Sequence, residues 1–383
     1  MSALKNKTIL ILSPQAWGTM FVSKHHYAVE LAKYGNKVFF LNPPDAKLRK
    51  RIEIRPIQTS PDLFVISHRL NFPYNLKFHA IGIFHWLMKL QIKKILQSVG
   101  NKIDIVWSFD LGNLYPFKFF PQTALRIFHP VDEPMNTDAF HSANGAEIIF
   151  SVTNEILDKY NNLTVPLHFI NHGVSEDFLN QSIKEQKSGN LRVGFSGNLL
   201  RNDIDRPVLL QIISENPQIV FECWGSYQSK DNNIGGVMTS EASLFISSLR
   251  NFPNVILHGA VNALSLAKDY QQMDAFLICY DIKKDQSKGT NYHKVIEFLS
   301  TGKVIVSNNI STYRNKPSLI EMVENRTNND DLPRLFKKVM QHLSVYNSDK
   351  AQAERRKFAA ENSYQMQLVT IEKLISIHCA ERE

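Results

Sequence analysis

The sequence predicts an α/β fold made of two doubly wound, Rossmann-like domains that face each other across a cleft. Three observations support this fold class. The 383 residues exceed the size of one typical domain. Short apolar runs alternate with helical patterns in both halves of the chain, as parallel sheets with crossover helices require. A polar stretch without apolar periodicity, residues 181–190, separates the two alternating sets.

The N-terminal half supplies the elements of the first domain, residues 1–180. Its first strand is a short apolar run, and a helix follows that begins at Ser23 and stops at Gly35. A long amphipathic helix is expected over residues 78–99. Strands are predicted at residues 8–12, 37–41, 103–109, 124–128, 148–152 and 167–170.

After the linker at residues 181–190, a second alternating set predicts a domain over residues 191–350. Asp205 is placed to cap a helix in which Pro207 falls in the first turn, where proline is tolerated. The last stretch, residues 351–383, is predicted as a C-terminal helix that can cross back to the N-terminal domain. Strands are predicted at residues 192–196, 219–224, 255–258, 275–279 and 304–306. Two such domains place their ligand between the carboxyl ends of their sheets.

Composition and charge limit the classes of partner and compartment. The formal charge is +8, so we expect an anionic partner: a nucleotide, a phospholipid surface or nucleic acid. The three cysteines lack metal-ligand or redox spacing, which favours a reducing compartment. The apolar run at residues 8–13 is too short for a signal-peptide core, and residues 78–90 are too few to span a bilayer. A cytoplasmic location is therefore expected.

Several widespread chemical motifs are absent from the sequence. The loop after the first strand, residues 13–18, lacks the Gly-x-Gly-x-x-Gly pattern, and no Walker lysine loop occurs. A dinucleotide oxidoreductase or an ATPase of the usual type is therefore disfavoured. No Asp-x-Asp pair stands between a strand and a loop, and Asp330 and Asp331 lie in a polar segment typical of a loop. We expect no metal ion in the active site.

The most informative stretch is residues 288–307, which predicts a loop, a helix, a stop at Gly302 and a buried strand. Lys294 and Glu297 are three residues apart and share one face of the helix. At the carboxyl edge of a sheet, Lys294 suits a phosphate and Glu297 suits ribose hydroxyls. Asn291, just ahead of the helix, is assigned to the same nucleotide site. The alternative is an ordinary amphipathic helix with a solvated ion pair.

A glycine-bearing loop follows the strand predicted at residues 192–196. The backbone at Gly197 and Asn198 and the guanidinium of Arg201 are predicted to hold a diphosphate. Together with Arg201, Lys288 would balance the charge of a diphosphate leaving group, roughly −2, without a metal. A plain glycine turn is the alternative.

Two further strand ends carry candidate residues. The amides of His258 and Gly259 are assigned to a nucleobase. His129 and Asp132 follow the strand at residues 124–128 and are predicted to orient an acceptor hydroxyl or to move its proton. The alternatives are a plain turn at the first place and a loop histidine with an Asp-Glu turn at the second.

The order and spacing of these pieces resemble the GT-B glycosyltransferases. Within them, the match is to the retaining branch classified as family four, which includes bacterial cell-surface polysaccharide enzymes. Most of the chain takes part in the resemblance. It is carried by Trp17 with Ser23-Lys-His-His-Tyr27, by His172-Gly-Val-Ser175, by Val193-Gly-Phe-Ser-Gly-Asn198 with Asp205, and by residues 254–260, 270–274 and 288–307. Glu297 matches the second carboxylate of the family's Glu-x7-Glu element, whereas Gly289 stands in the place of the first.

The resemblance implies a hexosyltransferase that uses a UDP- or GDP-sugar as donor, binds it in the second domain and needs no cofactor. It further implies transfer with retention to a glycan or a lipid-linked acceptor in surface polysaccharide synthesis. Two other functions stay open: a nucleotide-sugar 2-epimerase on the same scaffold, and a non-catalytic nucleotide- or carbohydrate-binding protein.

The positive charge of the helix at residues 78–99 also indicates where in the cell the protein acts. With Lys77, Lys89, Lys93 and Lys94, this helix suits peripheral contact with the anionic inner face of a membrane. The alternative is a helix that packs only on its own sheet. We expect no nucleic-acid partner.

Overall fold

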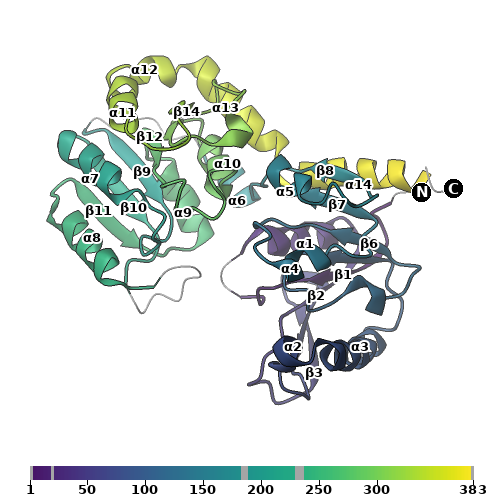
Figure 1. Cartoon of the computed structure of the whole chain (residues 1–383). Coiled ribbons are helices and arrows are strands. Elements are labelled where there is room, and N and C mark those ends of the chain that lie inside the picture. The colour runs from purple at the N-terminus through teal and green to yellow at the C-terminus, as the bar shows by residue number, and fades with distance from the viewer. Residues whose placement is uncertain (1–2, 19–20, 183–188, 229–236, 381–383) are drawn as a thin grey trace. The chain divides into compact units, whose positions relative to one another are not determined.

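The computed structural model describes residues 3–18, 21–182, 189–228 and 237–380. The chain forms two compact units (Figure 1). The first contains Met1–Asn171 and Tyr364–Glu383, and the second contains His172–Ser363. The chain thus enters the second unit ahead of the linker expected at residues 181–190, of which residues 183–188 lie outside the described residues.

The first unit is built on an eight-stranded sheet with the order β3-β4-β2-β1-β5-β6-β7-β8. Its strands are β1 (Thr8–Leu12), β2 (Lys37–Leu41), β3 (Ile52–Ile57), β4 (Ser60–His68), β5 (Ile105–Ser108), β6 (Leu125–Phe128), β7 (Ile148–Ser151) and β8 (Leu167–Phe169). The six parallel strands predicted from the sequence are confirmed. The antiparallel hairpin of β3 and β4 was not predicted. Pro56 lies in β3, which is the edge strand, where a missing amide donor does least harm.

Helices with apolar faces cover both sides of this sheet. They are α1 (Ser23–Lys33), α2 (Leu76–His79), α3 (Ile81–Ser98), η1 (Phe117–Phe119), α4 (Thr137–His141), α5 (Asn154–Asp158) and α14 (Tyr364–Ala380). α1 and α14 pack on the face that carries Ile9 and Trp107, whereas α3 packs on the face that carries Leu10 and Val106. The helix expected over residues 78–99 is two helices, because the backbone of Ala80 (φ −149°, ψ 63°) is not helical.

The second unit is built on a six-stranded, fully parallel sheet with the order β11-β10-β9-β12-β13-β14. Its strands are β9 (Arg192–Ser196), β10 (Val220–Trp224), β11 (Val255–Gly259), β12 (Ala275–Ile278), β13 (Val304–Ser307) and β14 (Glu321–Met322). Its helices are α6 (Glu176–Leu179), α7 (Arg206–Glu215), α8 (Ser240–Asn251), α9 (Ala263–Tyr270), α10 (His293–Ser300), η2 (Ser311–Tyr313), α11 (Leu332–Gln341), α12 (Leu343–Tyr346) and α13 (Asp349–Glu361). The five strands predicted here are confirmed. In the described ranges of the whole chain, no helix has both the length and the apolar character needed to cross a membrane.

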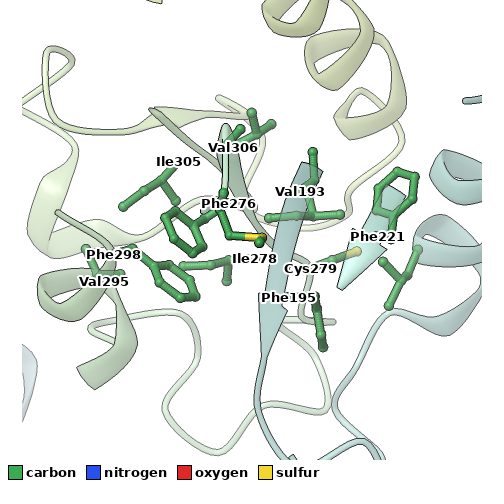
Figure 2. Packing of buried hydrophobic residues seen from close by; sticks show 14 of the residues in the cluster. Val193, Phe195, Phe221, Phe276, Ile278, Cys279, Val295, Phe298, Ile305 and Val306 are labelled. Carbon is green, nitrogen blue, oxygen red and sulfur yellow. The ribbon is translucent and has the colours of Figure 1, made fainter. Parts of the chain in front are cut away.

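Aromatic packing fixes the orientation of α10 in the second unit (Figure 2). The rings of Phe276 on β12 and Phe298 on α10 stack with centroids 4.1 Å apart. Gly194 on β9 leaves the space for this pair, since a Cβ there would lie 2.7 Å from the Phe276 ring. With one face of α10 held against the sheet in this way, the positions of Lys294 and Glu297 on the helix are set as well.

Each sheet has a point at which the strand order reverses. In the second unit, the chain proceeds from β9 outward to β10 and from β12 outward to β13 in the opposite direction. In the first unit, the same reversal falls between β1 and β5. The carboxyl ends of two such strands flank the crevice where open α/β sheets bind their ligands. These two places therefore contain the candidate sites.

Candidate functional site

Lys294 and Gly197 meet at the reversal point of the second unit. The ammonium of Lys294 donates to the backbone oxygen of Ser196, at the carboxyl end of β9, and to the hydroxyl of Tyr280, just after β12. It lies 4.6 Å from the centre of the Tyr280 ring. Gly197 has a φ of +149°, and a Cβ there would lie 2.7 Å from both the lysine Nζ and the tyrosine oxygen. A glycine is therefore needed for the cation to reach this position.

Glu297 lies one turn further along α10. Its side chain is 15% exposed, and its Oε1 is 3.4 Å from Nδ1 of His293. Burial raises the pKa of Glu297, while electrostatic interactions with His293 and Lys294 act to lower it. His293 in turn packs edge-on against His172, with ring centroids 5.5 Å apart. His293 was not among the predicted residues, although its i,i+4 spacing from Glu297 is visible in the sequence.

Arg201 is anchored by a carboxylate that was not predicted. Its Nε donates to Asp203 at 2.9 and 3.0 Å, and its Nη2 forms an ion pair with the same carboxylate. The Asp203 side chain is 3% exposed, whereas that of Arg201 is 40% exposed. The hydrogen bonds to Asp203 raise the pKa of Arg201 above its ordinary value. A diphosphate at this loop would compete with Asp203 for the guanidinium, so the role of Arg201 stays a prediction.

The loop ahead of α10 is organised around Asp285, which is 4% exposed. Its carboxylate accepts hydrogen bonds from the amides of Ser287 and Gly289 at 3.0 and 2.9 Å. The hydroxyls of Ser287 and Tyr292 donate to it as well, both at 2.7 Å. Four donors use the acceptor capacity of one carboxylate. Asp285 therefore holds the loop, and it has little capacity left for a ligand.

Only a glycine suits the backbone at position 289. Its φ is +63°, and a Cβ there would lie 2.8 Å from the backbone oxygen of Asn309. A glutamate does not fit this backbone. The neighbouring Lys288 also has a positive φ, +50°, and its side chain is exposed, while its carbonyl accepts from Arg326 at 2.6 Å. Asn291 follows and is 6% exposed.

His258 and Gly259 end β11, two strands from β9. Nε2 of His258 is 2.8 Å from Glu222, and its ring stacks on Trp224 with centroids 4.9 Å apart. The register pairs Gly259 with Trp224 and Trp224 with Ser196. Two strand spacings, about 10 Å, thus separate this turn from the end of β9. The structure does not bring His258 together with Lys294. Asn198 lies closer to the lysine, directly after Gly197, and is 9% exposed.

A cavity of about 490 Å³ opens elsewhere in the second unit, between the loop after β10 and α8. The guanidinium of Arg250 lies 5.6 Å from the centre of the Tyr227 ring at its wall. Its lining residues are Tyr227, Gln228, Met238, Ser243, Ile246, Ser247 and Arg250. The cavity has no residue in common with the predicted set.

In the first unit, a buried lysine stands at the reversal point. Lys24, in the first turn of α1, is 2% exposed. Burial lowers its pKa, and the charges of Asp132 and Asp110 act to raise it. Asp110, just after β5, is 6% exposed and accepts from the amides of Gly112 and Leu114 at 2.8 and 2.7 Å. Burial raises the pKa of Asp110. Asp132 is the exposed member of this group. Lys24 was not predicted as a site residue.

His129 requires a correction. It is fully buried, its ring stacks on Phe109 with centroids 5.0 Å apart and on Trp107 at 6.1 Å, and neither ring nitrogen has a hydrogen-bond partner. Burial lowers its pKa to about 3, with Lys24 contributing. His129 is therefore neutral at pH 7, and the expectation that it exchanges protons near neutrality was wrong. β6 ends one residue before it, and the aromatic core continues past the strand end.

Among the residues that the structure describes, no three His, Cys, Asp or Glu side chains gather closely enough to hold a metal ion. Metal-independent chemistry stays a prediction.

No family model matches the sequence, and no curated protein matches it. Solved structures do match. Sucrose-phosphate synthase from Thermosynechococcus elongatus superposes with a TM-score of 0.72 at 12% identity, covering 98% of this chain and 100% of that one. The α,α-trehalose 6-phosphate synthase of Burkholderia multivorans gives 0.69 at 10% identity, covering 99% and 98%. Anabaena HepE, in complex with UDP and glucose, gives a TM-score of 0.64 at 12% identity, covering 98% of this chain and 99% of that one. The chain therefore has the α/β GT-B fold that the sequence predicted.

Proposed function

We propose that this chain is a glycosyltransferase that moves a sugar from a UDP- or GDP-sugar to a glycan or lipid-linked acceptor, with retention, in surface polysaccharide synthesis. The observation that supports it most is the meeting of Lys294 and Gly197 at the reversal point of the second sheet, with Glu297 one turn further along α10. A cation and an open backbone approach at the carboxyl end of β9 suit a diphosphate. The shielded carboxylate one turn away suits ribose hydroxyls.

The spacing of the other elements supports a nucleotide in the same place. The turn at Gly259 lies two strand spacings from the end of β9 in the register of the sheet. A nucleotide in this place would extend from its diphosphate at Gly197 toward its base at Gly259. In this proposal His258 and Gly259 face the base, and Asn198 and Asn291 border the phosphates and the ribose. Arg201 and Lys288 balance the leaving-group charge.

The proposed chemistry needs no strong protein base. The acceptor oxygen forms a bond to the anomeric carbon, the bond from that carbon to the phosphate oxygen breaks, and the departing phosphate takes the acceptor's proton. The neutral, buried state of His129 supports this assignment of the proton, since an imidazole with a pKa of about 3 is a poor base. In this proposal, Asp132 and Lys24 position the acceptor and do not transfer its proton.

Gly289 favours one alternative, a non-catalytic nucleotide- or carbohydrate-binding protein. The family's first carboxylate faces the transferred sugar, and here the backbone at that position excludes a side chain. A 2-epimerase on the same scaffold is the other alternative. Its products separate it from a transferase, because it would release a free, epimerised sugar nucleotide.

The test is a panel of nucleotides and nucleotide sugars in thermal-shift assays, followed by sugar transfer and hydrolysis with the best ligand. A ligand at about one hundred times its Kd stabilises the folded protein by roughly 2.7 kcal/mol. Glu297→Gln should weaken nucleotide binding by about 10- to 150-fold, since charge-assisted hydrogen bonds contribute roughly 1.5–3 kcal/mol. Glu241→Gln on α8, whose side chain is 85% exposed, is the matched control. If no nucleotide stabilises the chain, the proposal fails; binding without turnover would favour the non-catalytic alternative.

A further inference from the structure

The first unit displays a group of large apolar side chains to solvent. Their exposed fractions are 46% for Tyr74, 69% for Phe78, 46% for Ile81, 56% for Ile83, 61% for Trp86 and 43% for Leu90. We call these six residues the α2–α3 apolar face. Single exposed apolar residues are normal on a soluble protein, but a cluster within residues 74–90 marks an interaction surface.

Packing of α3 on its own sheet does not account for this face. The residues that α3 buries against the sheet include Phe84, Met88 and Ile92, which recur at four-residue spacing. Ile83, Trp86 and Leu90 follow one another at intervals of three and four residues. They therefore share one side of the helix, opposite to the side that packs on the sheet. The N-terminal half of α3 is thus apolar on both sides, which its contacts within the unit do not require.

The sequence segment that carries the face has charged residues of a single sign. Residues 63–103 contain no Asp or Glu and six Lys or Arg. Lys89, Lys93 and Lys94 are exposed on α3 beyond the apolar half. Lys77, expected to join them, is instead structural: its side chain is 7% exposed, pairs with Asp138 at 2.8 Å and donates to the Gly112 oxygen at 2.5 Å.

The face adjoins the ligand edge of the first unit. β4 runs parallel to β2, so the chain leaves β4 at the carboxyl edge of the sheet, and α2 and the start of α3 follow there. Lys77, next to Phe78, contacts Gly112 in the loop after β5. The amide of Gly112 in turn donates to Asp110, which is one of the two carboxylates whose charges act to raise the pKa of Lys24.

We infer that the α2–α3 apolar face docks this protein on an anionic lipid bilayer. The apolar side chains enter the boundary between headgroups and acyl chains, where tryptophan is favoured, and Lys89, Lys93 and Lys94 lie against the anionic headgroups. Charge complementarity selects this occupant over a second copy, because two such faces would bring like charges together. The inference deepens the proposed function, on which it rests only for the lipid-linked acceptor.

Flotation of the full chain with vesicles tests the docking without donor or acceptor. Binding to phosphatidylcholine vesicles that contain phosphatidylglycerol should exceed binding to phosphatidylcholine alone, and brominated lipid should quench Trp86. Each large apolar side chain removed should reduce partitioning about tenfold or more, so the double variant Ile83→Ser/Trp86→Ser should release the protein. Lys93→Gln and Lys94→Gln should each reduce binding about fivefold on anionic vesicles only.

The matched control is Leu244→Ser/Val345→Ser in the second unit, whose side chains are 70% and 69% exposed. This variant should float like the wild type, and unchanged circular dichroism and melting should show that every variant folds. Wild-type protein that stays with the buffer, or an Ile83→Ser/Trp86→Ser variant that still floats, would overturn the inference. So would a dimer in sedimentation velocity that this variant disperses, since a second copy would then cover the face. Loss of nucleotide binding in Glu297→Gln leaves flotation unchanged, which separates this test from that of the proposed function.

Discussion

Replacing Lys294 by methionine removes the charge at the reversal point of the second sheet and keeps most of the aliphatic stem. In the free protein the ammonium is already held by the Ser196 oxygen and the Tyr280 hydroxyl, so little side-chain entropy remains to be lost when a ligand binds. A charged hydrogen bond to a phosphate is worth roughly 1.5–3 kcal/mol, which predicts a Kd for the nucleoside diphosphate that rises about 10- to 150-fold.

The assay is calorimetric titration with a diphosphate, a monophosphate and the bare nucleoside of the preferred base. The effect of the substitution should fall in that order and vanish for the nucleoside, because only the phosphates meet the cation. Lys284→Met is the control, since this lysine lies in the loop ahead of α10, is 59% exposed and pairs with Asp281 at 3.5 Å. An equal loss of affinity for all three ligands, or no loss for the diphosphate, would refute the placement of the phosphates at Gly197.

Two further predictions concern stability and acceptor transfer. The pKa of His129 is about 3 in the folded protein and about 6.5 in the unfolded chain. Between these two pH values the imidazole takes up a proton when the protein unfolds. The contribution of His129 to the free energy of unfolding therefore keeps its full value above pH 6.5 and is lost as the pH falls toward 3. His129→Phe should therefore flatten the acid limb of the stability curve by up to about 1.4 kcal/mol per pH unit relative to wild type, as measured by urea unfolding at several pH values, whereas identical slopes would contradict the burial of the ring. Asp132→Asn should lower transfer to acceptor while leaving nucleotide affinity unchanged, and equal effects on both would show that this carboxylate does not serve the acceptor.

The periodicity of the sequence predicted most of the sheet. β9 was predicted with its observed bounds, residues 192–196, because a short apolar run between a polar stretch and a glycine has few other structures open to it. The β3–β4 hairpin was not predicted: Pro56 within the short run of β3 argues against a central strand, although the alternation of apolar and polar residues around it is typical of a strand. Residues at strand ends could be proposed for the same reason that strands could: the carboxyl ends of parallel strands share one edge.

The partners of those residues could not be predicted. Whether Arg201 is free or held by Asp203 depends on the path of a short loop, and spacing of two residues leaves both outcomes open. His129 lies one residue past a strand, where a histidine can face either solvent or core, and the aromatic rings that enclose it come from three other segments. Lys24 is buried, and the carboxylates whose charges act on it, Asp110 and Asp132, are distant in sequence, so its position in the first turn of α1 did not indicate the site.

The last helix has a consequence for how this protein is synthesised. α14 supplies Tyr364, Leu368, Ile371 and Ile375 to the core of the first unit, and Tyr27 on α1 donates a hydrogen bond to Gln367 at 2.6 Å, across 340 residues of chain. The second unit, in contrast, is continuous, and its two ends pair with each other at Val174 and Ser363. During translation, all residues of the second unit are therefore synthesised before α14, which completes the core of the first unit. Until then, the surface of the first unit that α14 covers stays exposed to solvent. During this interval, the N-terminal segment can bind chaperones or aggregate.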